Sequence, residues 1–531
     1  MQRSHSRERG ALRKEPGGKL AVALVYPNAY RLGMANLGLH AVYRLFNADP
    51  DARCERAFLP DDGGEPLTVE SGRPLREFDV VAFSVSFEDD DANVLAILDR
   101  AGLPLRAADR DARHPLVVAG GIALQINPEP LAPFFDAVLV GEGEVLVPPF
   151  LAAVRAARAA GAPRAELLER LAGGPGVYVP ALYDVEYSDT RAPEGRWVTR
   201  FAPRGAAPAR VARVYLPDLR GVATSRVVDS PDAQFGDLYL TEVARGCLWG
   251  CRFCAAGFVQ RPYREVDLET LRAEAREGLA RGQRIGLVGP DTSDHSGLDP
   301  LTCEIAAEGG TFSPASLRVD AITPALAHRL ADGGERSITL APEAGSQRMR
   351  DVINKNHTEE ELMASVGTAA REGYTGAKLY FMCGLPGETD DDLRAILDLS
   401  HQAWQRARAE GNRSFRITVS VSPHVPKPHT PFAWAEQIST AELNRRLGVL
   451  RQAAHGKPVT LKYRDAETSL LEGVFTRGDR RLGLAVEEAF RRGCRFDAWT
   501  EHLRFGTWME VFRDLGIDPE RQLIERSTEC E

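Results

Sequence analysis

The first part of the chain alternates short apolar runs with amphipathic stretches, a pattern typical of parallel α/β sheets. Helices are indicated around 37–46, 93–100 and 148–159, after or between these runs. This βαβ order predicts a doubly wound, mostly parallel sheet with a ligand crevice at the carboxyl ends of its strands. The predicted strands are Leu20–Val25, Phe78–Ser84, Pro115–Gly121 and Asp136–Glu142.

A second series of apolar runs begins near residue 237, and helical stretches such as 359–372 and 391–408 separate several of its members. The same reasoning predicts a second α/β region with six strands. Loops that follow the strands are where its reactive groups should lie. The predicted strands are Leu238–Glu242, Arg284–Gly289, Ser316–Ala321, Ser337–Pro342, Gly376–Met382 and Arg416–Val421.

Three stretches lack this alternation. Residues 161–235 are rich in Ala, Arg, Pro and Gly and contain only short candidate strands, so we interpret them as a bridging segment. Residues 436–531 have a helical pattern, with Leu443 and Leu447 on one face, and we expect a small helical domain there. Residues 1–18 are polar and basic without an apolar run, and we expect a disordered tail.

Composition narrows the class of protein. The chain of 531 residues is 44% hydrophobic and 27% charged, as is ordinary for a soluble globular protein. Its net charge of −9 gives no overall basic field for nucleic acid. No apolar run reaches the length of about 18 residues that a membrane helix needs. Eight cysteines are too sparse for a disulfide framework. We therefore expect a cytoplasmic protein with reduced thiols and no membrane partner.

Three of the cysteines, Cys247, Cys251 and Cys254, lie within eight residues in a C-x3-C-x2-C spacing. Three close thiolates can hold three irons of a cubane 4Fe–4S cluster, which normally takes four cysteines. One iron would then stay open to another ligand. The alternative is a structural zinc site, which usually closes four positions. No second cysteine pair, and no histidine within thirty residues after Cys254, completes such a site in the sequence.

This loop, with Phe253 directly before the last cysteine, resembles the cluster-binding loop of the radical S-adenosylmethionine (SAM) superfamily. The resemblance implies that SAM binds the open iron, and that the reduced cluster splits SAM into methionine and a 5′-deoxyadenosyl radical. It also implies a partial (β/α)6 barrel over residues 236–435, with reactive groups at the carboxyl ends of the strands. An external electron donor of flavodoxin or ferredoxin type is implied as well. Phe253 becomes a candidate cofactor-binding residue.

Segments after the cysteine loop follow in superfamily order. Ala341–Arg348 resembles the fourth-strand motif, in which Glu343 would accept hydrogen bonds from the ribose hydroxyls of SAM, with Ser346 beside it. The alternative for Glu343 is a helix N-cap. Gly289 and Asp291 follow the second predicted strand, where relatives contact the methionine amino group.

Two further segments resemble the superfamily pattern. Met382–Thr389 resembles the fifth-strand segment whose backbone meets the adenine, and Pro423–Phe432 forms a proline-stiffened loop after the sixth strand. The resemblance implicates Gly384, Leu385 and Pro386 in cofactor binding. The candidates to face the substrate are His424, Lys427 and His429, for which the alternative is a solvated loop.

The layout of residues 19–160 resembles the cobalamin-binding domain that precedes many radical SAM domains. The corners Ala119–Gly121 and Gly141–Glu144 fit that family, since glycine lets backbone approach a large planar ligand. The cobalamin-ligating D-x-H-x-x-G motif is absent, because no aspartate stands two positions before His40. Cobalamin is therefore a possible cofactor, and a fold of this type that no longer binds it is the alternative.

The sequence predicts a radical SAM enzyme of unassigned reaction. With cobalamin, methyl transfer to an unactivated carbon is the natural reaction; without it, radical rearrangement, cyclisation or cleavage is open. A non-catalytic iron–sulfur or zinc scaffold is the remaining alternative. Methylthiolation of RNA is disfavoured, because the similar methylthiotransferases carry a second cysteine triad upstream and Cys54 alone cannot supply it. The substrate, whether small molecule, peptide or RNA, is left open.

Overall fold

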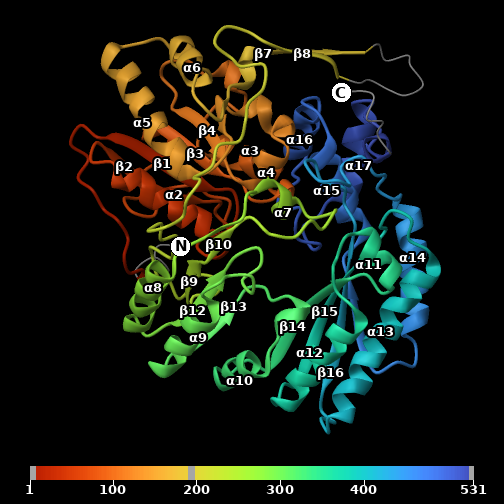
Figure 1. Cartoon of the computed structure of the whole chain (residues 1–531). Helices are drawn as coiled ribbons and strands as arrows, with labels where there is room; N and C mark the ends of the chain where they lie inside the picture. Colours follow the sequence, from red (N-terminus) through yellow and green to blue (C-terminus); the bar gives the residue numbers. More distant parts are fainter. Residues whose placement is uncertain (1–6, 189–197, 525–531) are drawn as a thin grey trace. The chain divides into compact units, whose positions relative to one another are not determined.

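The computed structural model describes residues 7–188 and 198–524, and the chain divides into two compact units (Figure 1). Each unit contains its own parallel sheet, which confirms the α/β fold class predicted from the sequence. The first unit comprises Met1–Pro217, Arg226–Gly236 and Val474–Gln522. The second comprises Asp218–Ser225, Asp237–Gly473 and Leu523–Glu531.

The main sheet of the first unit has the strand order β2-β1-β3-β4-β5-β6. Its first five strands are parallel, and β6 pairs antiparallel with β5. The direction of winding reverses between β1 and β3, so the expected ligand crevice lies outside the carboxyl ends of these two strands. The strands are β1 Leu20–Tyr26, β2 Ala52–Phe58, β3 Val80–Ser84, β4 Leu116–Gly120, β5 Ala137–Leu139 and β6 Val177–Tyr178.

Alternate residues of these strands build an apolar core on one face of the sheet. Val22 of β1 and Val118 of β4 lie in it beside Tyr43 and Phe150. Tyr43 belongs to α2 (Leu37–Ala48) and Phe150 to α5 (Gly143–Ala160), and these two helices pack against each other. Each fully buried side chain of this kind contributes about 2 kcal/mol. Further elements of this unit are α1 Tyr30–Gly33, α4 Ile122–Ile126, α6 Arg164–Ala172, β7 Tyr183–Tyr187 and β8 Val198–Pro203.

Strand β2 was not predicted, because Arg53, Glu55 and Arg56 interrupt its apolar pattern. The structure buries these charges in pairs. Arg53 Nη1 lies 2.6 Å from Glu55 Oε1, and Arg56 donates from Nε to Glu70 Oε1 and from Nη2 to Glu8 Oε2, both at 2.7 Å. Charged strand residues are thus tolerated here because each guanidinium has a carboxylate partner.

The prediction of a disordered tail over residues 1–18 is wrong for part of that stretch. Residues 1–6 lie outside the described residues, but Glu8 is almost fully buried against Arg56. Leu12 N also donates to the Tyr43 hydroxyl at 2.9 Å. Polarity alone does not separate a solvated tail from one whose charges complete a buried ion pair.

The stretch 436–531, expected to be one helical domain, is divided between the two units. In the first unit, α16 (Leu482–Arg491) packs against α3 (Asp91–Arg100) and the short helix η5 (Glu129–Phe134). The approach is close: a Cβ on Gly483 would lie 2.8 Å from Pro133 Cγ, so a larger side chain would push the elements apart. The helical pattern predicted these helices, but it does not specify which sheet they pack on. The last helix of this unit is α17, Phe505–Asp514.

The second unit contains a three-stranded sheet, β13-β12-β9, and a four-stranded sheet, β14-β15-β16-β17, and all of these strands are parallel. Helices α12 (Glu359–Arg371) and α13 (Asp390–Ala409) pack side by side, and α13 lies against β15 and β16 (Figure 1). This is the partial barrel that the sequence predicts. The strands are β9 Leu238–Glu242, β12 Arg284–Val288, β13 Phe312–Pro314, β14 Ser337–Glu343, β15 Gly376–Cys383, β16 Arg416–Pro423 and β17 Val459–Tyr463.

Two strands differ from the prediction. The third strand is β13, not Ser316–Ala321, whose second half forms the 3-10 helix η7 (Val319–Ala321). There the chain turns, because the Ser316 hydroxyl donates to Gly289 O and Pro290 O at 3.1 and 3.2 Å. The unpredicted strand β17 lies within the stretch expected to be helical, at the edge of its sheet, where three of its five residues are exposed. Remaining elements are α7 Ala255–Val259, α10 Pro324–Asp332, α11 Gln347–Val352, α14 Thr440–Ala454, α15 Ala466–Arg477, β10 Ala244–Arg245 and β11 Arg264–Glu265.

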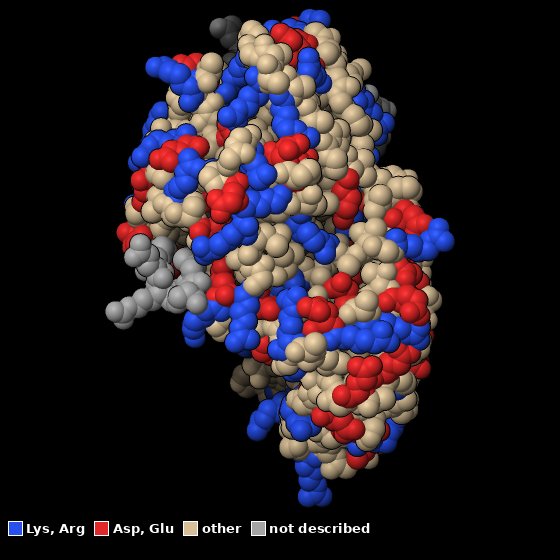
Figure 2. All heavy atoms as spheres, turned by 90° about the vertical axis from the view of Figure 1, so that its left-hand side faces the viewer, with Lys and Arg blue, Asp and Glu red and all other residues tan. Residues whose placement is uncertain are grey.

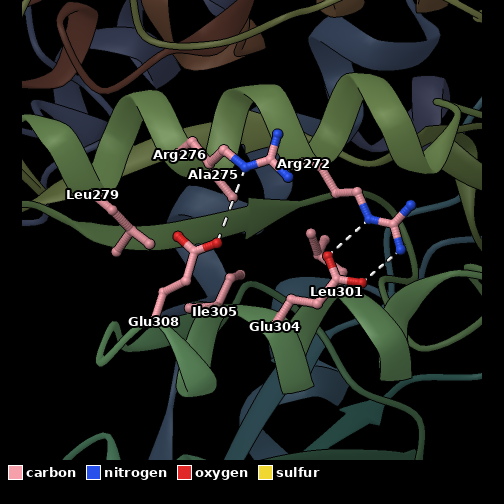
Figure 3. Close-up of a pocket in the computed structure, with 8 residues that line it drawn as sticks. All are labelled: Arg272, Ala275, Arg276, Leu279, Leu301, Glu304, Ile305 and Glu308. Carbon is pink, nitrogen blue, oxygen red and sulfur yellow. Dashed lines mark hydrogen bonds and ion pairs between the residues drawn. The ribbon is translucent and has the colours of Figure 1, made fainter.

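Ion pairs join two outer helices of the second unit, α8 (Leu268–Ala280) and α9 (Leu298–Ala307) (Figure 3). Arg272 Nε lies 2.7 Å from Glu304 Oε2, and Arg276 Nε lies 4.0 Å from Glu308 Oε1. The hollow beneath these pairs has a volume of only about 10 Å³. It is therefore a helix-packing feature and too small for a ligand.

The visible surface mixes charges of both signs. Figure 2 shows acidic and basic side chains interspersed over the face it presents, in keeping with the net charge of −9. Within the described residues, no helix combines the length and the hydropathy needed to cross a membrane.

Candidate active site

The cysteine loop follows β9 and β10 and ends at α7 in the second unit. It begins at Gly246, whose φ of +75° is costly for any residue with a side chain. A Cβ there would also lie 2.6 Å from Pro262 O. At the other end, Cys254 is the N-cap of α7, and its Sγ accepts a hydrogen bond from Gly257 N at 3.3 Å. Glycine and the helix start thus fix the two ends of the loop.

The donor set fits a thiolate-bound cluster. Besides the bond to Cys254, Cys247 Sγ accepts from Trp249 N at 3.5 Å, and such N–H donors stabilise charge on sulfur. Burial raises the pKa of all three thiols, that of Cys251 to about 11, and Lys355 opposes this at Cys251. Metal binding would therefore displace protons. Among the described residues, no three His, Cys, Asp or Glu side chains converge as a site for a single metal ion.

Backbone contacts anchor the loop to two other parts of the unit. Arg252 N donates to Ile353 O at 2.9 Å, and Asn354 Nδ2 donates to Gly250 O at 2.9 Å. Phe432 N donates to Arg252 O at 3.1 Å. The loop is therefore held by the segment after α11 and by the loop after β16.

Phe253 contributes to an apolar cluster beside these anchors. It packs with Phe432 against a buried cluster that joins the ends of β14 and β15 to α11. The buried members are Ala344, Met349, Ile353, Met382 and Leu385. The structure thus brings together Phe253 and Leu385, two of the residues that the sequence implicated in cofactor binding.

Glu343 ends β14 with an unusual backbone. Its φ is +68°, and the pairing of β14 with β15 shifts register between Leu340 and Glu343. A non-glycine residue in this conformation costs about 1–3 kcal/mol and is found most often at functional sites. Glu343 Oε1 lies 3.5 Å from Lys355 Nζ. Burial raises the pKa of the Glu343 carboxyl, and Lys355 opposes that rise.

Ser346, not Glu343, is the N-cap of α11, since its Oγ accepts from Met349 N at 3.2 Å. The N-cap alternative for Glu343 is therefore excluded. The Ser346 hydroxyl also donates to Asp392 Oδ1 at 2.6 Å, so it joins α11 to α13. Gly345 serves the same packing, because a Cβ on it would collide with the backbone of Ile396 in α13.

Asp291 and Gly289 lie after β12, next to the third-strand loop. Asp291 is buried, and its Oδ1 accepts from Ser293 N at 3.1 Å. Burial raises the pKa of Asp291, while Ser293, Arg318 and Lys355 oppose the rise. Lys355 therefore acts electrostatically on Asp291, Glu343 and two of the cysteines, which shows that these groups share one region of the unit.

The loop after β15 is fixed by a buried carboxylate. Gly384, with φ of +93°, donates from its N to Glu388 Oε2 at 2.7 Å, and Glu388 is paired with Arg446 Nη1 at 2.9 Å. Burial raises the pKa of Glu388 to about 7. Leu385 is buried and Pro386 follows it, so this turn has a rigid, apolar inner side.

The three candidates after β16 differ in environment. His424 is buried edge-on against the Phe432 ring, with ring centroids 5.7 Å apart. Lys427 Nζ forms a largely buried ion pair with Glu472 Oε1 at 2.9 Å. Only His429, with φ of +65°, has an exposed side chain.

Sequence reasoning missed four residues of this region. Lys355 lies after α11, Asp294 after β12 and Arg318 after β13, and single-sequence patterns do not bring such loops together. Trp249 is different, because its position between Cys247 and Cys251 could have marked it as a site residue. Its indole Nε1 donates to Asp294 Oδ2 at 2.6 Å, and the Arg318 guanidinium carbon lies 3.5 Å from the centre of its ring.

In the first unit, the strand order predicts a ligand position at the carboxyl ends of β1 and β3. His40 is buried, and backbone atoms contact both of its ring nitrogens. Nε2 lies 3.0 Å from Met34 O, and Nδ1 accepts from Val227 N at 3.3 Å. Burial lowers the pKa of His40 to about 3. The glycine corners do not cradle a ligand, because Cβ atoms on Gly121 and Gly141 would collide with the backbone of Val85 and Val214.

Asp90, which is fully buried after β3, lacks a full set of hydrogen-bond partners among the described residues. Its Oδ1 accepts from Asn28 Nδ2 at 2.7 Å and from Asn93 Nδ2 at 3.0 Å, whereas the buried Oδ2 has no hydrogen-bond partner among the described residues. Burial raises the pKa of Asp90 to about 7. An orphaned carboxyl oxygen at this point is compatible with a polar ligand group.

Two protein families match this chain, and each match lies within one of the two units. Residues 38–180 match the family described as radical SAM proteins, N-terminal, and residues 241–400 match the radical SAM superfamily. An uncharacterized protein of Methanocaldococcus jannaschii is 25% identical over 501 residues, which are 93% of this chain and 97% of that protein. The ribosomal protein uS12 methylthiotransferase RimO of Pelotomaculum thermopropionicum is 26% identical over 256 residues, 44% of this chain and 57% of that enzyme. This chain thus spans little more than half of that methylthiotransferase.

A solved structure shares the fold. It is the radical SAM methyltransferase TsrM from Kitasatospora setae, with cobalamin and a 4Fe–4S cluster bound. It has a TM-score of 0.52 and 16% identity, and the match covers 78% of this chain and 77% of that one. The cysteine loop, the partial barrel and the two family matches lead to one conclusion: the chain is a radical SAM protein with an N-terminal domain of the kind found in that superfamily.

Proposed function

We propose that the second unit holds a 4Fe–4S cluster through Cys247, Cys251 and Cys254 and binds SAM at the iron that these thiols leave open. The observation that carries this proposal is the meeting of the three-thiol loop with Glu343. Lys355 is the electrostatic neighbour of both. The N–H groups that donate to Cys247 and Cys254 suit sulfurs that carry negative charge.

A cluster held by Cys247, Cys251 and Cys254 would supply radical chemistry: one electron from the external donor would pass through it and break a sulfur–carbon bond of bound SAM, which releases methionine. The residues of this chain bind and orient. Glu343 accepts hydrogen bonds from the ribose hydroxyls, and Lys355, whose Nζ lies 3.5 Å from Glu343 Oε1, favours the charged form of the carboxyl against the effect of burial. Asp291, with Gly289 beside it, receives the ammonium group of the methionine moiety.

Apolar surfaces bind the adenine. Phe253 and Leu385 supply part of this wall. Glu388 holds the turn at Gly384–Pro386 rigid, so that its backbone can meet the base. Ser346 supports the site by fixing α11 against α13. His429, whose side chain is exposed, is our candidate to reach the substrate. His424 and Lys427 shape the same loop through Phe432 and Glu472.

Two reactions remain as proposals. Cobalamin-dependent methyl transfer to an unactivated carbon draws support from the fold shared with TsrM and from the orphaned oxygen of Asp90. His40 would not hold cobalamin, because backbone atoms of the chain contact both of its ring nitrogens. A cobalamin-independent rearrangement or cyclisation draws support from Gly121 and Gly141, because the chain's own backbone fills the space beside these glycines, where a ligand was expected. Either reaction needs an external electron donor of flavodoxin or ferredoxin type, and we propose a cytoplasmic location for both.

The proposal is tested by anaerobic reconstitution with iron and sulfide, addition of dithionite and SAM, and quantification of 5′-deoxyadenosine. We expect 5′-deoxyadenosine from the native chain and none from Cys251→Ala. The matched control is Cys303→Ala, because Cys303 is exposed on α9 and should leave the yield unchanged. A colourless, zinc-replete and inert preparation would support the scaffold alternative. Cobalamin absorbance in the purified protein decides between the two reactions.

A further inference from the structure

Trp249, inside the cysteine loop, is held between two oppositely charged side chains. Its indole Nε1 donates to Asp294 Oδ2 at 2.6 Å. The guanidinium carbon of Arg318 lies 3.5 Å from the ring centre, which is a close cation–π contact. Asp294 follows β12 and Arg318 follows β13, so side chains from the loops after two neighbouring strands contact one residue of the cysteine loop.

The Arg318 side chain is itself fixed. It is buried, and its Nε and Nη2 donate to Asp320 Oδ1 and Oδ2 at 2.9 and 3.0 Å, a bidentate pair. Its backbone N donates to Ser293 Oγ at 3.1 Å. Because planar guanidinium groups stack and pair at once, lysine would not reproduce this arrangement.

Trp249 is also coupled to a proposed cluster ligand. Its backbone N donates to Cys247 Sγ at 3.5 Å, and its backbone O accepts from Arg261 Nη2 at 2.9 Å. The same residue therefore carries the Arg318 stack on its ring and an N–H donor to sulfur on its backbone. Asp294 also acts electrostatically on Cys247. Charged groups near a cluster affect its reduction, since reduction adds a negative charge.

We infer that Arg318 and Asp294 are positioning residues that act through Trp249 and set the reduction potential of the cluster in opposite directions. The inference rests on the proposed function. The buried cation of Arg318 stabilises the reduced cluster and raises its potential. The carboxylate of Asp294 lowers the potential, while its hydrogen bond fixes the indole plane.

The test is an EPR-monitored redox titration of the reconstituted holoprotein without SAM, at about pH 8. This pH lies above the pKa of about 6 to which burial raises the Asp294 carboxyl, so that group is ionised. Arg318→Met should shift the midpoint to a more negative potential. Asp294→Asn, which keeps an oxygen acceptor for the indole, should shift it to a more positive one. Arg318→Lys keeps the charge and should give a midpoint nearer to that of the native chain than Arg318→Met does.

Unchanged midpoints in both neutral variants, or shifts in the same direction, would overturn the inference. If Arg318 and Asp294 only support the fold, their variants should bind less iron, but the midpoint potential of the cluster that remains should not change. If Arg318→Met yields no folded protein, the Asp294→Asn midpoint still decides, because no shift or a shift to a more negative potential would overturn the inference. A native chain that takes up no cluster would instead overturn the proposed function, so the two failures are distinguishable.

Discussion

Lys355 Nζ lies 3.5 Å from Glu343 Oε1, although Glu343 ends β14 and Lys355 lies after α11. Glu343 has a left-handed backbone conformation at this position. The pair joins the end of β14 to the segment that anchors the cysteine loop through Ile353 and Asn354. The proposed ribose-binding residue and the proposed cluster loop are therefore linked by one short stretch of chain.

Glu343→Gln should weaken SAM binding. The substitution keeps the size of the side chain and an oxygen acceptor but removes the charge that strengthens hydrogen bonds from hydroxyls, a loss of about 1–1.5 kcal/mol. We expect the dissociation constant of SAM to rise by about 5- to 10-fold, measured by calorimetry on the reconstituted protein. The control is Glu360→Gln, at an exposed position of α12, which should not change the constant. Equal affinities of the native chain and Glu343→Gln would contradict the assigned role.

Gly246→Ala should impair cluster assembly. Gly246 and Gly282 have nearly the same φ, +75° and +74°, but only Gly246 has backbone within 3 Å of a built Cβ, whereas Gly282 has nothing within 4 Å. Backbone strain should cost each alanine variant about 1–2 kcal/mol of stability. Only Gly246→Ala should also lose iron, as measured by metal analysis after reconstitution. Equal iron in the two variants would show that the start of the loop has no special requirement.

The buried Asp90 should make stability pH-dependent. Its folded-state pKa is raised to about 7 by burial, above an unfolded value of about 3.9. The folded state holds the proton more tightly, so the free energy of unfolding falls as pH rises from about 4 to about 7. Asp90→Asn should flatten this decline in urea unfolding followed over that range. The same slope in both proteins would mean that Asp90 is ionised when buried.

Glu8→Gln should destabilise the first unit. The carboxylate of Glu8 pairs with the buried Arg56, which also has Glu70 as a partner. Removing the charge of Glu8 weakens charge-assisted hydrogen bonds to a buried group, a loss of about 1–3 kcal/mol. Urea unfolding should show this loss, and Glu15→Gln, at an exposed position nearby, should show none. A neutral effect of Glu8→Gln would restore the view that this stretch is a tail without structural role.

Much of the architecture was accessible from the sequence, because buried parallel strands are continuous apolar runs. β1, β3, β4, β9, β12, β14, β15 and β16 all coincide with predicted strands to within two residues at each end. β2 and β17 were not predicted, because charged or exposed residues interrupt their apolar pattern. The third strand of the second unit was predicted at Ser316–Ala321, which has a strand-like composition. In the structure the chain turns there, where the Ser316 hydroxyl donates hydrogen bonds to Gly289 O and Pro290 O.

The candidate site was accessible only where a local motif marks it. The spacing of the cysteines identified the loop, and Glu343 could be named from the segment around it. Lys355, Asp294 and Arg318 stand in loops without a motif, and their relation to Trp249 and Glu343 arises only when the strand ends are side by side. For the same reason, the sequence could not show that residues 474–522 belong to the first unit.

The central claim is that three cysteines hold a cluster whose open iron binds SAM. The most direct measurement is the EPR spectrum of the dithionite-reduced, reconstituted protein, recorded with and without SAM. We predict a spectrum of a reduced 4Fe–4S cluster whose g-values change when SAM is added, and no such signal from Cys247→Ala. A reduced cluster whose spectrum is indifferent to SAM, or a native protein that takes up zinc in place of iron, would contradict the account.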